Sequence, residues 1–103
     1  MIRHVVFVRF RKDVPPQEIE AILRQLQDLC AVLPGMTHFA GGPNVNPEGL
    51  DQGFTHAFSC DFVDAAARDA YLVHPAHRAA GARLVAATDG GREGLAVIDF
   101  SGT

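Results

Sequence analysis

The stretch RHVVFVRFR, residues 3–11, decides how the rest of the sequence is to be interpreted. It consists mainly of β-branched and aromatic residues, which is typical of a β-strand. Alternation along a strand gives two faces, with His4, Val6, Val8 and Phe10 on one and Val5, Phe7, Arg9 and Arg11 on the other. Because apolar side chains occur on both faces, we expect both sides of the sheet to be covered.

Residues 13–33 follow this strand and carry apolar residues at steps of three and four. This spacing predicts an amphipathic helix. Pro15 and Pro16 suit the first turn of a helix, and Pro34 with Gly35 is expected to end it. The apolar stripe consists of Ile19, Ile22, Leu23, Leu26, Leu29, Cys30 and Leu33.

The second half of the sequence predicts two further strands, a helical region and a last strand. Residues 36–40 form a short strand candidate, and a polar loop extends from there to residue 53. The strict alternation of FTHAFSCDF, residues 54–62, predicts a strand that places Phe54 on the same face as His56. Asp64 suits the N-cap of a helix over residues 65–71, and Pro75 is expected to break the helical region before it continues to residue 87. GLAVIDF, residues 94–100, predicts the last strand.

The resulting order, β-α-β-β-α-β, predicts an α+β, ferredoxin-like fold with a four-stranded antiparallel sheet and both helices on one face. Residues 1–103 are expected to form one domain, because no linker divides the chain. The other sheet face would be bare, and an exposed apolar face of that size favours association. We therefore expect a homodimer in which two copies meet through their sheet faces.

Composition excludes several classes of function. The net charge is −3 without a run of like charges, which disfavours nucleic acid and anionic membranes as partners. No apolar stretch approaches membrane-spanning length and the first residues do not form a signal segment, so a cytoplasmic location is expected. Cys30 and Cys60 lack a CxxC spacing and are expected to be buried thiols rather than a disulfide.

Three stretches of the chain resemble the stress-responsive A/B barrel domain family, also called the dimeric α/β barrel. They are RHVVFVRF at residues 3–10, GFTHAF at residues 53–58 and AYLVHPAHR at residues 70–78, of which the last is the most specific. The resemblance extends over essentially the whole chain in the same element order. It implies a homodimer in which two sheets face each other as an α+β barrel with the helices outside.

The family resemblance does not imply one activity. Many members are stress-induced or uncharacterised small proteins, whereas one plant member is a polyketide cyclase that closes a ring by aldol condensation. Its catalytic tyrosine and histidine match Tyr71 and His77 of this chain, and a histidine of its first strand matches His4. The many alanines of residues 79–87 indicate a smaller pocket than a large alkyl polyketide would need.

The residue types at these positions suit proton transfer without a cofactor. Tyr71, His74 and His77 are spaced by three and would share one side of a continuous helix. His77 could take a proton from a carbon acid next to a carbonyl, while Tyr71 donates to the developing oxyanion and His4 orients the base or the substrate. His74 is instead expected to cap the helix that restarts at Pro75.

Two interpretations of function remain open. The first is a homodimer that binds a small organic ligand in a cavity between helices and sheet, with Tyr71 and His77 holding the broken helix against the sheet. The alternative is a cofactor-independent, polyketide-cyclase-like enzyme that uses His77, Tyr71 and His4. His38 and His56 are expected to be structural.

No metal or other cofactor is expected. HPAH lacks the histidine spacing with an intervening Glu that marks a metalloprotease helix, and no Cys pair assists. A third interpretation, membership of the cofactor-free monooxygenases and haem-degrading proteins that share this architecture, is disfavoured because the chain has no Trp and no haem-attachment signature.

Overall fold

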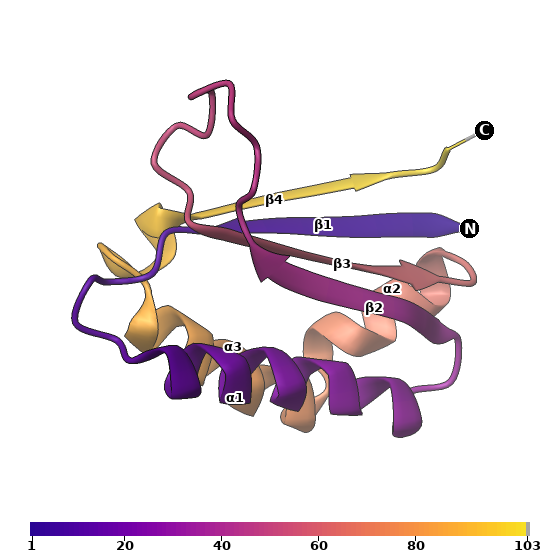
Figure 1. Ribbon diagram of the computed structural model, residues 1–103. Helices are drawn as coiled ribbons and strands as arrows, with labels where there is room; N and C mark the ends of the chain where they lie inside the picture. The colour runs from indigo at the N-terminus through magenta and orange to yellow at the C-terminus, as the bar shows by residue number, and fades with distance from the viewer. Residues whose placement is uncertain (103) are drawn as a thin grey trace.

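The computed structural model describes residues 1–102, which form an antiparallel sheet with helices packed on one of its faces (Figure 1). The elements are β1 Ile2–Val8, α1 Pro16–Asp28, β2 Met36–Pro43, β3 His56–Phe62, α2 Ala65–Val73, α3 Pro75–Ala87 and β4 Leu95–Phe100. Short 3₁₀ turns occur at Leu29–Ala31 and Gly91–Gly94. The predicted order β-α-β-β-α-β is confirmed.

The sheet has the strand order β2-β3-β1-β4, so the first strand of the chain lies in its centre. All three neighbouring pairs are antiparallel. In this register His4 lies opposite Cys60 of β3 on one side and Asp99 of β4 on the other. The register thus brings three chemically functional side chains into one row across the sheet.

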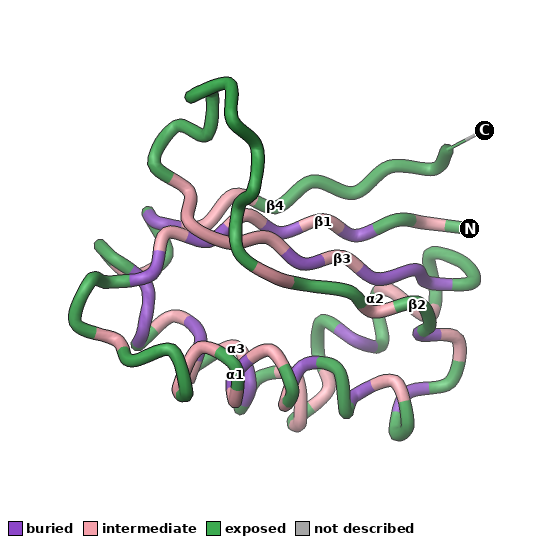
Figure 2. The backbone as a smooth tube through the Cα atoms, in the orientation of Figure 1, coloured by how far each residue is buried: buried purple, intermediate pink, exposed green. Residues whose placement is uncertain are grey.

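The core lies between the sheet and the helices (Figure 2). Val6 and Val8 of β1 and Phe10, two residues after it, are buried there, as the apolar pattern predicts. Ile22 and Leu26 of α1 cover them from the helical side. The remaining large side chains of this core include Leu29, Leu33, Met36, Phe58, Cys60, Phe62, Tyr71 and Leu84.

Several strand ends differ from the prediction. β2 continues to Pro43 rather than ending at Ala40, and β4 begins at Leu95 rather than Gly94. β1 stops at Val8 rather than Arg11, because the backbone of Arg9 bonds to the turn before β4, its N–H to Gly94 and its carbonyl to Asp89. β3 begins at His56 rather than Phe54, because the Phe54 N–H donates to the Asp51 carbonyl and closes a turn.

The predicted face of Phe54 is therefore wrong. Its ring lies 5.8 Å from that of Phe7, on the sheet face opposite to the helices, and not beside His56. Strict alternation places a side chain correctly only where the strand is continuous.

The predicted break in the second helical region is confirmed at His74. Its extended backbone conformation ends α2 and starts α3, and its Nδ1 accepts a hydrogen bond of 3.0 Å from the Ala76 N–H. Asp64 caps α2 in the same way through the Ala67 N–H. The break sets the relative directions of the helices that carry Tyr71 and His77.

Within residues 1–102, the helices are too short or too polar for any of them to cross a membrane.

Candidate functional site

Three aromatic rings from three different elements meet on the helix-covered face of the sheet. Tyr71 of α2 lies between His4 of β1, with ring centroids 5.6 Å apart, and His77 of α3, with ring centroids 3.9 Å apart. Phe62 of β3 packs against Tyr71 at 4.9 Å. The structure therefore brings together the three residues that the sequence analysis proposed as a site, and we call them the three-ring cluster.

The two titratable groups from the helices are held in their uncharged forms. Burial lowers the pKa of His77 and outweighs the contact with the Leu72 backbone, which acts in the opposite direction. Burial also raises the pKa of the Tyr71 hydroxyl above its ordinary value. At neutral pH the cluster therefore presents an imidazole that can accept a proton beside a hydroxyl that can donate one.

One polar atom of the cluster has no partner. His77 Nδ1 is buried and forms no hydrogen bond within the part of the chain that the structure describes. Leaving such a buried group unpaired costs about 1–3 kcal/mol, so its retention needs an explanation. One explanation is that His77 Nδ1 contacts a polar atom of a bound molecule.

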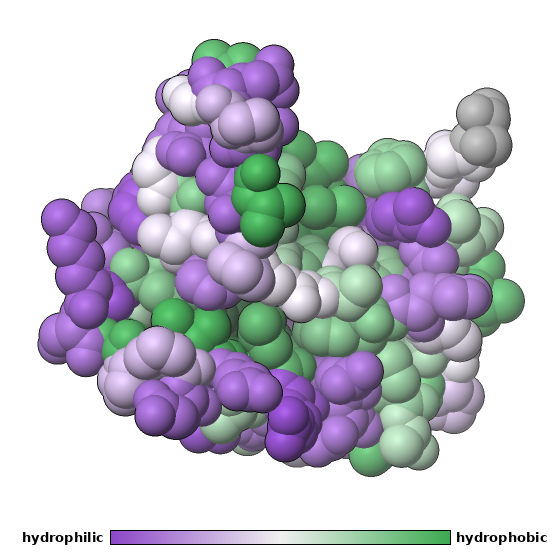
Figure 3. Space-filling view, in the orientation of Figure 1, coloured by the Kyte–Doolittle hydropathy of each residue, from purple (hydrophilic) through white to green (hydrophobic). Residues whose placement is uncertain are grey.

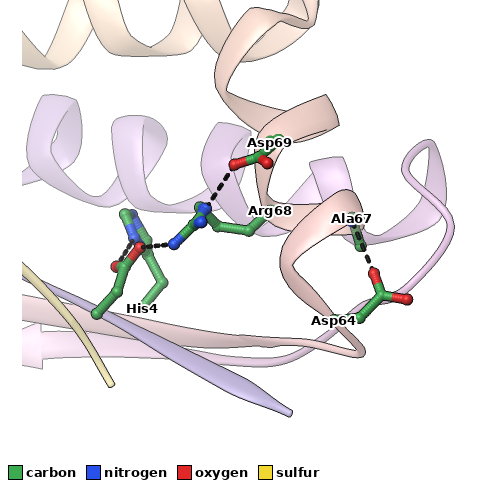
Figure 4. Close-up of polar contacts among 6 residues, drawn as sticks. His4, Asp64, Ala67, Arg68 and Asp69 are labelled. Carbon is green, nitrogen blue, oxygen red and sulfur yellow. Dashed lines mark hydrogen bonds and ion pairs between the residues drawn. The ribbon is translucent and has the colours of Figure 1, made fainter. Parts of the chain in front are cut away.

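Asp99 and Arg68 extend the cluster and were not found by sequence reasoning. His4 Nδ1 lies 2.7 Å from Asp99 Oδ1, and Arg68 Nη1 donates to Asp99 Oδ2 at 3.0 Å (Figure 4). Partial burial would raise the pKa of Asp99, but the hydrogen bonds from His4 and Arg68 outweigh it and hold that pKa below its usual value. The alternation in GLAVIDF indicates which sheet face Asp99 occupies, but it does not indicate that Asp99 contacts His4.

The other histidines have local partners and lie outside the three-ring cluster. His74 caps α3, as described above. His56 packs edge-on against Phe10 and contacts the Thr55 hydroxyl at 2.9 Å, and burial lowers the pKa of His56. His38 is exposed, at a bulge of β2, with its Nδ1 3.4 Å from Asp61. The structural roles expected for His38 and His56 stay predictions.

The three-ring cluster is tightly packed within a single chain. Among residues 1–102, none of five surface cavities is lined by His4, Tyr71 or His77. A groove of about 350 Å³ does lie between α1 and the β2–β3 edge, lined mainly by apolar residues and ending at His56. A second cavity, of about 290 Å³, lies on the open face of the sheet, where Phe7 and Phe54 line it. Of the two, only the first is a cavity between a helix and the sheet.

The two cysteines are free thiols in the described part of the chain. Burial raises the pKa of Cys60 to about 12. Among residues 1–102, no three His, Cys, Asp or Glu side chains are grouped so that they could hold a metal ion.

Comparisons with known proteins agree with this architecture. A family model described as the stress responsive A/B barrel domain matches residues 2–101. The stress-response A/B barrel domain-containing protein At5g22580 of Arabidopsis thaliana is 32% identical over 99 residues, which make up 95% of this chain and 83% of the relative. The olivetolic acid cyclase of Cannabis sativa is 22% identical over 76 residues, 74% of this chain and 75% of the cyclase.

The similarity to solved structures covers nearly the whole chain. A dimeric ferredoxin-like protein of unknown function from Jannaschia sp. CCS1 superimposes with a TM-score of 0.89 at 36% identity, over 97% of each chain. The α+β, ferredoxin-like fold is thereby confirmed.

Proposed function

This chain belongs to the stress responsive A/B barrel domain family, and from that premise we propose that two copies pair through their open sheet faces and that each binds a small organic molecule between helix and sheet. The dimeric assembly of the Jannaschia protein supports the pairing. The cytoplasmic location and the lack of a nucleic-acid partner remain predictions from sequence.

The observation that carries the pairing is the apolar character of the sheet face without helices. Val5 and Phe7 are only half-buried, whereas Ile98 and Phe100 of β4 are exposed. Figure 3 shows apolar side chains between the loop after β2 and β4, while α1 presents polar side chains to solvent. Such a face is stabilised when a second, identical face covers it, since a two-fold interface uses the same patch twice.

Two neighbouring residues of β4 provide a matched test. Ile98 and Val97 are exposed to 55% and 56%, but Ile98 shares the open face with Val5 and Val97 shares the helix-covered face with Val6. We expect the parent protein and Val97→Asp to sediment as dimers at micromolar concentration, and Ile98→Asp to sediment as a monomer. A parent protein that sediments as a monomer would overturn the pairing.

The groove between α1 and the β2–β3 edge is the proposed ligand site. Ile19, Leu23 and Pro43 line it and His56 supplies a polar group, which is the usual character of a small-molecule pocket. Its volume of about 350 Å³ suits a molecule with a single ring.

Acetophenone, an aromatic ketone, is a suitable probe of this groove. Its titration should shift the NMR signals of His56 and Leu23, and Leu23→Gln should weaken the binding. His38→Gln is the control and should leave the binding unchanged. Shifts confined to residues outside the groove would contradict the assignment.

A second candidate function, cofactor-independent proton abstraction next to a carbonyl, is favoured by the unpaired His77 Nδ1 beside Tyr71. In this proposal His77 is the base, the Tyr71 hydroxyl donates to the developing oxyanion and His4 orients the site. The olivetolic acid cyclase, at 22% identity, is a relative that is named as an enzyme, which supports this candidate.

Exchange of the acetophenone methyl hydrogens for deuterium tests this second function directly. The protein should accelerate the exchange over buffer, and His77→Gln should remove at least about 90% of the acceleration, since general-base catalysis contributes 10²–10⁴-fold. His38→Gln should retain it. Exchange no faster than in buffer would contradict catalysis on this substrate class, without bearing on the pairing.

A further inference from the structure

Side-chain size changes across the open face of the sheet, from small on one half to large on the other. The register places Ala40 of β2, Ser59 of β3, Val5 of β1 and Ile98 of β4 in one row across this face. The β2–β3 half of the row therefore carries small side chains, whereas the β1–β4 half carries branched apolar ones.

The small half is an open hollow, which we call the trough. It is formed by Ala40 and Gly42 of β2 with Ala57 and Ser59 of β3, and the hollow measures about 410 Å³. A Cβ added at Gly42 would meet no atom within 4 Å, so this part of the hollow is unfilled. The atoms that line such a space gain van der Waals contacts when another molecule fills it.

The large half protrudes, because β4 is an edge strand. Ile98 and Phe100 are exposed on the open face, and Figure 2 shows that β4 is exposed along most of its length. A protruding side chain and an unfilled hollow on the same face can serve as the two sides of one contact between identical copies.

We propose that the two copies pair in a defined orientation, in which Ile98 of each copy fills the trough of the other. The inference rests on the pairing proposed above. In a two-fold interface every contact between two different positions occurs twice, so both troughs are filled at once. The two-fold axis then runs along the strands, and β4 of one copy lies over β2 of its partner.

Packing disfavours the orientation in which the axis runs across the strands. Each strand would then lie over its own copy, with Ile98 against the partner's Ile98 and Ala40 against the partner's Ala40. Facing sheets lie about 10 Å apart, and a core without voids places large side chains opposite small ones. Two isoleucines in contact would hold the sheets apart and leave a void over β2.

The charges on the open face favour the same orientation. Arg3 of β1 and Asp61 of β3 lie opposite each other near one end of the strands. With the axis along the strands, Arg3 of each copy faces the partner's Asp61, so opposite charges meet across the interface. With the axis across the strands, this ion pair would face the partner's Phe7 and Ala57, whose side chains offer no polar partner.

An exchange of side-chain size across the interface tests the orientation. Ala40→Phe fills the trough and should raise the dimer dissociation constant in sedimentation equilibrium at least about tenfold. Ile98→Ala removes the protruding side chain and should raise it about tenfold. In the double variant the new ring occupies the space that the partner's Ile98 has vacated, so this variant should dimerise more tightly than Ala40→Phe alone.

Val97 supplies the matched control, because it is as exposed as Ile98 but lies on the other face of β4. Val97→Ala combined with Ala40→Phe should dimerise no more tightly than Ala40→Phe alone. If Ala40→Phe fails to fold, Gly42→Val replaces it, since its side chain would enter the same unfilled hollow, and the same outcomes apply.

Two outcomes would overturn the orientation and leave the pairing intact. One is a double variant in which the two losses of affinity multiply, and the other is an Ala40→Phe variant that dimerises as tightly as the parent. A parent protein that is monomeric at micromolar concentration would instead refute the pairing itself, and the orientation with it.

Discussion

Two clusters with the same three residue types, His, Asp and Arg, lie on opposite faces of the sheet. The helix-side cluster consists of His4, Asp99 and Arg68, and the open-face cluster consists of His38, Asp61 and Arg3. In both, an aspartate of a strand contacts an arginine and a histidine. The side chain of His4 is only 6% exposed, however, whereas that of His38 is 79% exposed.

The two clusters therefore differ in the burial of the histidine and not in residue type, because Asp61 is itself only 9% exposed whereas Asp99 is 24% exposed. On the open face Arg3 donates two hydrogen bonds, of 2.8 and 3.2 Å, to Asp61 of the neighbouring strand. The exposed His38 adds a weak contact with Asp61. On the helix side the histidine is shielded from water and touches the ring of Tyr71. Substitutions that remove these distinguishing features one at a time should show what each contributes.

The largest effect is expected for the ring that shields the helix-side cluster. Tyr71 is 1% exposed, so Tyr71→Ala should lower the free energy of unfolding in urea by about 3–5 kcal/mol, the usual cost of removing a buried aromatic ring. Tyr71→Phe preserves the packing and is the control. A loss below about 1 kcal/mol for Tyr71→Ala would mean that the ring does not support the core.

Truncation of the two histidines should separate the clusters directly. His4→Ala removes a buried ring together with its hydrogen bond to Asp99 and should lower the free energy of unfolding by about 1–3 kcal/mol. His38→Ala removes an exposed ring and should change that free energy by no more than about 0.5 kcal/mol. Equal losses of unfolding free energy in the two variants would contradict the larger contribution expected from the buried His4.

The two aspartates should behave alike in acid. Partner hydrogen bonds hold the pKa of Asp61 and that of Asp99 below the usual range, so each is lower in the folded than in the unfolded chain. The stability that they contribute is present above an unfolded pKa of about 4 and is lost as the pH falls through the folded pKa. Asp61→Asn and Asp99→Asn should each therefore lose less stability on acidification than the parent.

Urea titrations at several pH values below about 6 measure this effect. Each asparagine variant should take up as much as one proton fewer on unfolding than the parent, which flattens the dependence of the unfolding free energy on pH. A slope as steep as that of the parent in Asp99→Asn would show that this carboxylate has the same proton affinity in both states.

The smallest effect concerns the backbone of the open-face cluster. His38 has a positive φ of 55°, a conformation that glycine adopts more easily. His38→Gly should therefore raise the melting temperature slightly, by an amount that corresponds to less than about 1 kcal/mol. A lower melting temperature would indicate that the His38 ring stabilises Asp61 more than its exposure suggests.

The sequence was sufficient to predict the faces of β1, the helical break at Pro75 and the capping role of His74, because each depends on neighbouring residues. The pairing of His4 with Asp99 could not be predicted, since it depends on the register between strands that are 95 residues apart. Arg68 could not be found either, because an arginine on a short helix is usually solvated. Phe54 was assigned to the wrong face because the turn at Asp51 interrupts the alternation.

The last strand carries both of the features on which the two proposed functions depend, since Ile98 belongs to the open face and Asp99 to the helix side. A slip of β4 by a single residue would exchange these positions. The turn that sets its start allows little freedom, because a Cβ at Gly94 would lie 2.3 Å from the Asp89 carbonyl oxygen. An insertion or deletion there that shifts β4 by one residue would remove the pairing surface and the partner of His4 in one step.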